Sequence, residues 1–461
     1  MTTVLPDSLI QSLQSATGFD EVSFKEVHAS GDQLVSVRLN PAKVKEAAAV
    51  PFLRAVLAEK VPWSQQGYYL QQRPLFTIDP LFHAGAYYVQ EASSMFLEQA
   101  LRQSCDLTQP MRVLDLCAAP GGKSALIQSL LHPESLLVSN EVIKTRAAVL
   151  AENITKWGAA NVVVTNNDPS HFKKLPGLFD CIVIDAPCSG SGLIRKDPAA
   201  ILEWSEQNVA LCSLRQQRII AEVLDALKPG GILIYSTCSY SIAEDEAIAD
   251  WVKDFGGLNN IRLSILPEWG IIETISDKHH CYGYRFYPDK AKGEGFFISV
   301  FKKEVSDTIG SNKKVQIKPP LASKMEQEIV SGYLKSDIAF SFIKWQQDIL
   351  AIPSAILEDV LALQQNLYIK KAGLNLGSII RNELIPSHEW ALSSMAAPVL
   401  PFVAVNEATA LDYLRRKDIV LESEIRGWAV LTYEGLALGL VKILSNRLNN
   451  YYPKEWRILN K

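Results

Sequence analysis

From residue 111 onward the chain alternates short apolar runs with helical stretches, and this alternation is the strongest constraint on its fold. The apolar runs predict strands at residues 112–117, 136–140, 161–165, 179–185 and 231–236. The stretches between them predict helices at residues 124–131, 145–157 and 206–227. Strands that alternate with helices of this length indicate an α/β fold with a doubly wound parallel sheet. Two further runs, 284–288 and 295–301, predict an antiparallel hairpin that closes one edge of the sheet.

The region before this sheet has a mixed character. Residues 1–85 predict a small α+β domain, with a strand near residues 34–40 and a helix near residues 43–60. The alternative is an extension that only caps the sheet. Residues 83–95 contain helix-start residues, but they are dense in aromatic side chains and hydrogen-bond donors for an ordinary linker. We therefore expect them at the rim of an active site.

The composition changes after the core, which we assign to residues 86–303. Residues 306–320 are polar and predict a linker, and residues 304–365 as a whole are expected to form this linker and a mainly helical segment. Short strand-like runs then recur between Gly and Asn residues. Residues 366–461 therefore predict a small β-rich terminal domain.

The composition excludes several classes of protein. A hydrophobic share of 48% and a mean hydropathy of +0.05 are typical of a soluble globular protein. No secretory signal is visible at the start, and the most apolar window, residues 391–405, is interrupted by Pro398 and Pro401. Seven cysteines without framework spacing indicate reduced thiols, so we expect a cytoplasmic protein. Because no Cys-x-x-Cys motif occurs, no metal site is expected. The net charge of −4 means that any nucleic-acid binding must depend on local basic surface.

The first predicted strand leads into a glycine-containing loop with the sequence Cys117-Ala118-Ala119-Pro120-Gly121-Gly122-Lys123-Ser124. Small residues at a strand-to-helix turn let a ligand approach the backbone N–H groups. A phosphate loop would need glycine at position 117, and the dinucleotide fingerprint is also absent. The remaining interpretation is a loop for the polar tail of a nucleoside cofactor, with Lys123 available to pair with a carboxylate.

The next two strand ends carry polar residues suited to the rest of such a cofactor. Glu141 follows the second strand, about 20 positions beyond the loop, where ribose hydroxyls are usually bound. Asn166, Asn167 and Asp168 follow the third strand and could accept a hydrogen bond from an exocyclic amine. Each residue could instead be an ordinary helix cap or turn residue.

Two cysteines stand at the ends of the fourth and fifth strands. Cys188 lies in the turn that begins Asp185-Ala186-Pro187, and Cys238 lies between Thr237 and Ser239. A free cysteine is most often a buried packing residue, which is the role we expect for the thiols of Cys117, Cys181 and Cys212 beside apolar runs. Polar flanks and sharp turns make that role a poor fit for Cys188 and Cys238. In open α/β sheets the ligand crevice lies beyond the carboxyl ends of the strands.

Two thiols beside a nucleoside cofactor suit methylation of cytosine at C5. This carbon is a poor nucleophile until a thiolate adds to C6 and breaks the aromaticity of the ring, which splits one hard step into two easier ones. The adduct must then lose its C5 proton and expel the sulfur, so a second group is useful. A carboxylic acid near N3 would neutralise charge on the ring, and Asp185 has the type and location for this.

The segments Leu116–Lys123, Asp185–Gly190 and Ser236–Ser239 resemble the signature segments of the NOL1/NOP2/Sun family of RNA (cytosine-5-)methyltransferases. The resemblance covers about residues 80–303 and implies a Rossmann-like class I methyltransferase core that uses S-adenosylmethionine. It implies that Cys238 is the nucleophile, that Cys188 releases the product, and that Asp185 assists. It further implies a set of cofactor-binding residues, namely Cys117, Ala118, Ala119, Pro120, Gly121, Gly122, Lys123, Glu141, Arg146, Asp168 and Asp185.

The flanking regions are similar to those of the bacterial RsmF-like branch of this family, which acts on 16S ribosomal RNA. In that branch the C-terminal extension includes a PUA-like domain. Basic residues interleaved with Tyr and Trp near the C-terminus suit an RNA-facing surface, and the candidates are Arg447, Lys454 and Arg457. The alternative is a solvated face of a β-barrel. We expect an RNA or ribosomal-particle partner, no membrane, and a monomer.

Three other functions remain open at this stage. In a DNA cytosine-5 methyltransferase the cysteine of a Pro-Cys pair attacks, which would make Cys188 the nucleophile. The substrate could also be a transfer RNA. A non-catalytic assembly factor could bind ribosomal RNA through its outer domains, although the two cysteines and the complete cofactor loop disfavour that reading.

Overall fold

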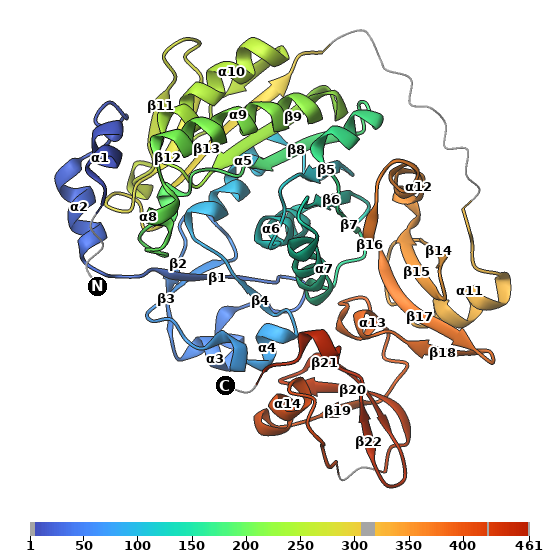
Figure 1. Ribbon diagram of the computed structural model, residues 1–461. Coiled ribbons are helices and arrows are strands. Elements are labelled where there is room, and N and C mark those ends of the chain that lie inside the picture. Colours follow the sequence, from blue (N-terminus) through green and yellow to red (C-terminus); the bar gives the residue numbers. More distant parts are fainter. Residues whose placement is uncertain (1–4, 306–318, 422–423, 460–461) are drawn as a thin grey trace.

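The computed structural model describes residues 5–305, 319–421 and 424–459, and its largest element is a mixed sheet of ten strands (Figure 1). In spatial order these strands are β11 (Ile272–Ile275), β12 (Tyr282–Phe286), β13 (Phe296–Lys303), β9 (Leu227–Thr237), β8 (Phe179–Asp185), β5 (Arg112–Asp115), β6 (Leu136–Asn140), β7 (Val162–Thr165) and β16 (Ile369–Ala372), with β10 (Leu258–Ile261) paired to β13. The strands from β9 to β7 pair in parallel. The predicted doubly wound, Rossmann-like core is therefore confirmed.

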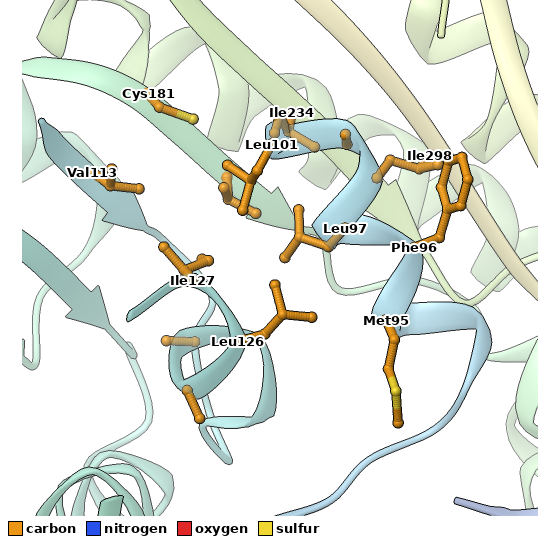
Figure 2. Packing of buried hydrophobic residues seen from close by; sticks show 14 of the residues in the cluster. Met95, Phe96, Leu97, Leu101, Val113, Leu126, Ile127, Cys181, Ile234 and Ile298 are labelled. Atoms are coloured by element: carbon orange, nitrogen blue, oxygen red, sulfur yellow. The ribbon is translucent and has the colours of Figure 1, made fainter. Parts of the chain in front are cut away.

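Helices cover both faces of this sheet, and they are α5 (Leu97–Ser104), α6 (Gly122–Leu130), α7 (Lys144–Trp157), α9 (Glu206–Val223) and α10 (Glu246–Gly256). Successive strand residues point to opposite faces, so Val113 packs with α5 and α6 whereas Leu114 packs with α9. Figure 2 shows Leu101 and Ile127 directed toward Val113 from the first of these faces. In the part of the chain that the structure describes, no helix is long and apolar enough to cross a membrane.

The predicted hairpin is present, since β12 and β13 pair antiparallel with Tyr284 opposite Ile298. It joins the edge of the parallel sheet as predicted, because β13 pairs antiparallel with β9, and β11 adds one more strand outside β12. The opposite edge is also extended, because β16 from the C-terminal region pairs antiparallel with β7.

The N-terminal region is an α+β unit with helices α1 (Asp7–Leu13) and α2 (Glu21–Ala29) and a sheet of β2 (Leu57–Lys60), β3 (Gly67–Leu70), β1 (Val35–Leu39) and β4 (Tyr87–Val89). The predicted strand near residues 34–40 is β1. The predicted helix at 43–60 is wrong, because this range contains only the 3-10 turn η1 (Ala47–Ala49) and the short α3 (Pro51–Arg54). Pro51 disfavours helix before it, and Leu57 already pairs with β3. This sheet runs past the predicted boundary at residue 85, since β4 pairs with β1.

The segment expected to be mainly helical, within residues 304–365, contains a β-hairpin as well as helices. Its elements are α11 (Lys324–Ser331), β14 (Phe340–Trp345), β15 (Asp348–Pro353) and α12 (Leu357–Asn366). The apolar run at Ile349–Ile352 is short, and periodicity alone cannot separate a buried strand from a helix at that length. The linker predicted at 306–320 falls mostly on residues 306–318, which lie outside the described residues.

The boundary expected at residue 366 also differs from the structure, because β15 pairs with β17 (Leu374–Ile380), which pairs with β18 (Glu383–Pro386). The final region is β-rich as predicted. It consists of α13 (His388–Leu392), β19 (Phe402–Ala404), α14 (Glu407–Leu414), β20 (Gly427–Tyr433), β21 (Leu436–Ile443) and β22 (Leu448–Asn450).

The packing of β9 predicts a large stability loss for Ile234→Ala. Ile234 is fully buried between α5 and the sheet, so truncation leaves a cavity and should lower the free energy of unfolding by about 2–5 kcal/mol. Chemical denaturation measures this change. The matched control is Ile275→Ala on edge strand β11, where the side chain is 50% exposed and a loss of roughly 1 kcal/mol or less is expected. Equal losses in the two variants would contradict the assigned core.

Candidate active site

The loop between β5 and α6 forms one wall of a small cavity at the carboxyl edge of the sheet. Gly121 precedes α6 with a φ of 118°, a conformation that favours glycine. A Cβ at Gly122 would lie 3.0 Å from the ring of Tyr88, so a side chain there would crowd the opposite wall. The cavity, of about 150 Å³, is lined by residues 117–120, 122, 123, 185, 88–91 and 94. The segment expected at the active-site rim thus contributes this opposite wall.

Lys123 and Asp185, which both line this cavity, form an ion pair. Lys123 Nζ lies 2.8 Å from Asp185 Oδ2, and Ser236 donates a hydrogen bond of 2.9 Å to Asp185 Oδ1. Burial lowers the pKa of Lys123, but the charge and hydrogen bond of Asp185 outweigh it and raise that pKa above its ordinary value. The carboxylate that Lys123 pairs with is therefore one of the chain's own.

The thiols of Cys188 and Cys238 lie in contact, with their sulfurs 3.0 Å apart. Both follow neighbouring parallel strands whose ends are in register, Asp185 of β8 opposite Ser236 of β9. Both cysteines are partly exposed. The hydrogen bond with Cys238 and burial raise the pKa of Cys188, which favours the protonated form of this thiol.

The turn after Cys188 fits closely against the Cys238 loop. The N–H of Gly192 donates to the carbonyl of Cys238 at 2.9 Å. A Cβ at position 192 would lie 2.8 Å from the same carbonyl oxygen, so the contact requires glycine. The two loops that carry the thiols are thus held together by backbone as well as by the sulfurs.

The other three cysteines considered as packing residues differ among themselves. Cys181 and Cys212 are buried in the core, as expected. Cys117 packs against the core on one side, but it is partly exposed and also lines the cavity. Burial raises the pKa of its thiol, which disfavours a reactive thiolate there.

None of the three other predicted cofactor residues, Glu141, Arg146 and Asp168, lines the cavity itself. Arg146 donates a hydrogen bond of 2.7 Å to the carbonyl of Ala119 and lies 3.4 Å from Glu141. Asp168 caps the short helix η4 (Pro169–Lys174), because its Oδ1 accepts hydrogen bonds from the N–H and hydroxyl of Ser170. These bonds lower the pKa of Asp168. The sequence left two interpretations of Asp168 open, a contact to the exocyclic amine of a cofactor and a helix cap, and the structure shows the helix cap.

Asp115 at the end of β5 is a buried carboxyl group close to the ion pair. Its Oδ2 accepts a hydrogen bond of 2.6 Å from Ser124, while its Oδ1 has no hydrogen-bond partner. Burial raises its pKa to about 7. Within the ranges that the structure describes, no three His, Cys, Asp or Glu side chains converge as metal ligands would.

Two features were missed by sequence reasoning. Glu244 accepts hydrogen bonds from both cysteine loops, and the acidic run Glu244-Asp245-Glu246 soon after Cys238 was the available signal. The second is a basic cavity of about 460 Å³ in the C-terminal region, where Lys454 and Arg457 meet Arg415 and Arg416. Arg447, the third candidate for RNA contact, is exposed in the turn before β22 and does not line this cavity.

Three family models match the chain. Residues 5–92 match the N-terminal domain of 16S rRNA methyltransferase RsmF, residues 104–302 match 16S rRNA methyltransferase RsmB/F, and residues 401–458 match the methyltransferase RsmF PUA domain. The order of the three models follows the order of the regions in the structure.

Curated relatives are similar over nearly the whole chain. A ribosomal RNA small subunit methyltransferase F from Aeromonas hydrophila is 29% identical over 98% of this chain and 97% of its own length. The protein of the same name from an Enterobacter species (strain 638) is 30% identical over 91% of this chain and 89% of its own length.

Solved structures resemble the chain in fold. A methyltransferase homolog from Pyrococcus horikoshii is 27% identical with a TM-score of 0.51, and covers 65% of this chain and 100% of its own. NSun6 from the same organism, solved with SFG, is 18% identical with a TM-score of 0.54, and covers 66% of this chain and 100% of its own.

The buried carboxyl of Asp115 predicts a pH-dependent effect of Asp115→Asn on stability. An acid whose pKa is raised on folding is stabilising below its unfolded pKa, and that contribution is lost as pH rises through the folded value. The free energy of unfolding of the native chain should therefore fall, relative to that of the variant, as pH rises from about 4 to about 7. Denaturation curves across this range measure the difference. Parallel pH profiles for the two proteins would contradict the assigned pKa.

Proposed function

Because the chain belongs to the ribosomal RNA small subunit methyltransferase F family, we propose that it methylates C5 of a cytidine in 16S ribosomal RNA, with S-adenosylmethionine as methyl donor. The observation that carries this proposal is the pair of thiols at the ends of β8 and β9, with sulfurs 3.0 Å apart. The cavity lined by Lys123 and Asp185 supports a cofactor site at the same edge of the sheet.

The residues around the loop fit a nucleoside cofactor with a charged tail. Gly121 and Gly122 have no side chains that would cover the backbone of the loop. Oδ1 of Asp115 has no hydrogen-bond partner and is therefore a free acceptor. We assign Cys117 to Lys123 to the tail, Glu141 with Arg146 to the ribose, and Asp168 to the base. S-adenosylmethionine, when bound, supplies a methyl group attached to a positively charged sulfur, which carbon nucleophiles attack.

Cys238 starts the reaction by bonding to the cytosine ring. Its sulfur forms a bond to C6, and the electron pair of the C5–C6 double bond moves toward C5, which then takes the methyl group. Asp185 takes a proton from Lys123 Nζ, with which it is paired, and gives that proton to N3 as charge builds on the ring. When the product forms, N3 returns the proton to Asp185, and the ion pair with Lys123, 2.8 Å away, is restored.

Cys188 completes the reaction by removing the proton from C5. The electron pair of that C–H bond restores the C5–C6 double bond, and the sulfur of Cys238 leaves C6 as a thiolate. Once Cys238 is bonded to carbon, its hydrogen bond and its negative charge no longer raise the pKa of Cys188. Cys188 can then give its own proton to water, and the thiolate that remains is the base that the last step needs.

RNA binding is assigned to basic surface outside the catalytic core. Arg415, Arg416, Lys454 and Arg457 line one cavity, and four cations in one concave surface suit RNA phosphates. Arg447 in the turn before β22 adds a further cation. This local surface supplies the positive charge that the overall charge of −4 does not.

Opposite outcomes are predicted for the two cysteines. Cys238→Ala should lower the methylation rate by at least about a thousandfold and form no protein–RNA adduct, because the nucleophile is lost. Cys188→Ala should accumulate a stable adduct, because attack proceeds while release fails. Denaturing gels of protein mixed with 16S ribosomal RNA and cofactor measure the adduct, and bisulfite sequencing of the RNA locates the methyl group.

Each variant serves as the control for the other, since both remove one thiol from the same pair. An adduct formed by Cys238→Ala but not by Cys188→Ala would reverse the two roles, as in a DNA cytosine-5 methyltransferase. Methylation of a transfer RNA without methylation of 16S RNA would correct the substrate.

Loss of charge from the basic cavity predicts weaker RNA binding. The double variant Lys454→Gln with Arg457→Gln removes two candidate phosphate contacts, so the slope of log affinity against log salt should decrease by about 1.4. Filter binding at several salt concentrations measures this slope. The matched control replaces exposed Arg262 and Lys278, which already pair with Glu273 and Asp254, and should leave the slope unchanged. Equal slopes in both double variants would remove this cavity from the RNA site.

A further inference from the structure

A buried carboxylate lies behind the two thiols. Glu244, at the end of the short helix η7 (Ile242–Glu244), has no exposed surface. None of the described residues forms an ion pair with it. Burying a carboxylate without a cation costs folding free energy unless hydrogen bonds replace its hydration. The groups that donate hydrogen bonds to Glu244 therefore indicate its role.

Four donors converge on the two oxygens of Glu244. Oε1 accepts from the N–H of Ser189 at 2.8 Å and from Gln216 Nε2 at 3.1 Å. Oε2 accepts from the hydroxyl of Ser189 at 2.5 Å and from the hydroxyl of Ser239 at 2.7 Å. Because a carboxylate accepts about four hydrogen bonds, this group has no oxygen left for a proton or a substrate.

The serine donors are the immediate neighbours of the two thiols. Ser189 follows Cys188, and Ser239 follows Cys238. Glu244 therefore connects the two loops one residue away from each sulfur. Gln216 of α9 strengthens the connection, because its side-chain amide also donates to the carbonyl of Pro187 at 3.1 Å.

Glu244 itself is held in place from two sides. The hydroxyl of Tyr235 donates to its backbone carbonyl at 2.6 Å. Arg285 of β12 lies behind the following residues, 3.1 Å from Asp245 and bonded through Nε to Glu246 at 2.6 Å. The carboxylate is thus fixed to the sheet, and the loops are fixed to the carboxylate.

We propose that Glu244 is a positioning residue that sets the separation of the Cys188 and Cys238 sulfurs. The proposal rests on the function proposed above, and it assigns to Glu244 the coupling between attack and release. Attack on C6 requires one correctly placed sulfur, whereas release requires both. Loss of Glu244 therefore slows release more than attack.

The test compares Glu244→Ala with Glu244→Gln in the full chain. In Glu244→Ala the methylation rate constant should fall by about a hundredfold, the effect of a misplacement near 1 Å, while the affinity for S-adenosylmethionine stays unchanged. The covalent adduct between the protein and unmodified cytidine RNA should accumulate, because release is slowed more than attack. Glu244→Gln should recover much of the rate. The side-chain carbonyl oxygen of the glutamine can accept from the N–H of Ser189, and its amide NH2 group can donate to the hydroxyl oxygens of Ser189 and Ser239 once these hydroxyls have rotated.

Glu98→Ala is the matched control, since Glu98 is also fully buried and accepts hydrogen bonds from Ser64 and Arg102 away from the thiols. It should lower stability without adduct accumulation. If Glu244→Ala behaves in the same way, with activity lost only in proportion to folded protein, the positioning role is overturned. A native chain that neither methylates RNA nor forms an adduct would instead overturn the proposed function.

A second variant keeps the test decisive if Glu244→Ala does not fold. Ser189→Ala with Ser239→Ala removes both hydroxyl donors and leaves the carboxylate in place. This double variant should accumulate adduct and lower the rate constant, since the loops lose their side-chain links to Glu244. Native rates of both attack and release in this variant would overturn the proposal.

Discussion

The parallel pairing of β8 with β9 is the constraint on which the site depends. Residues in register on two neighbouring strands end at one edge of the sheet, so the turns after Asp185 and after Ser236 begin side by side. Neither thiol has to be brought in by a long loop. The sulfur contact, the ion pair of Lys123 with Asp185 and the carboxylate of Glu244 all depend on this register, and a slip of one residue would turn alternate side chains to the other face.

In the proposed mechanism the two thiols take different roles because their electrostatic surroundings differ, although the groups are chemically identical. Two identical groups in contact cannot both ionise easily, and the raised pKa of Cys188 favours its protonated form. When the pair carries one proton, the sulfur without it, proposed to be that of Cys238, can bond to carbon. The other sulfur, that of Cys188, can take part in proton transfer. The surrounding hydrogen bonds hold the two cysteine loops together, and in the proposed mechanism the bond from Cys238 to the ring changes which sulfur carries charge.

The central sheet could be predicted because its strands are continuous apolar runs between helices, as for residues 179–185. The cysteines could be singled out because polar turns flank them. The Glu244 contacts could not, since they join Ser189, Gln216 and Ser239 from three separate segments. The hairpin of β14 and β15 was missed because a short apolar run has no distinctive period, and β16 because its pairing partner, β7, is distant in the sequence.

The strand β16 comes from the C-terminal region of the chain but belongs to the catalytic sheet, because it pairs with β7. Beside it, the backbone N–H and carbonyl of Tyr368 bond to the side chain of Asn167, next to Asp168. Truncation before residue 369 would leave β7 with a bare edge, and bare edges invite aggregation. An RNA held by the C-terminal region, as proposed above, would therefore be positioned relative to the thiols partly through a strand of the catalytic sheet itself.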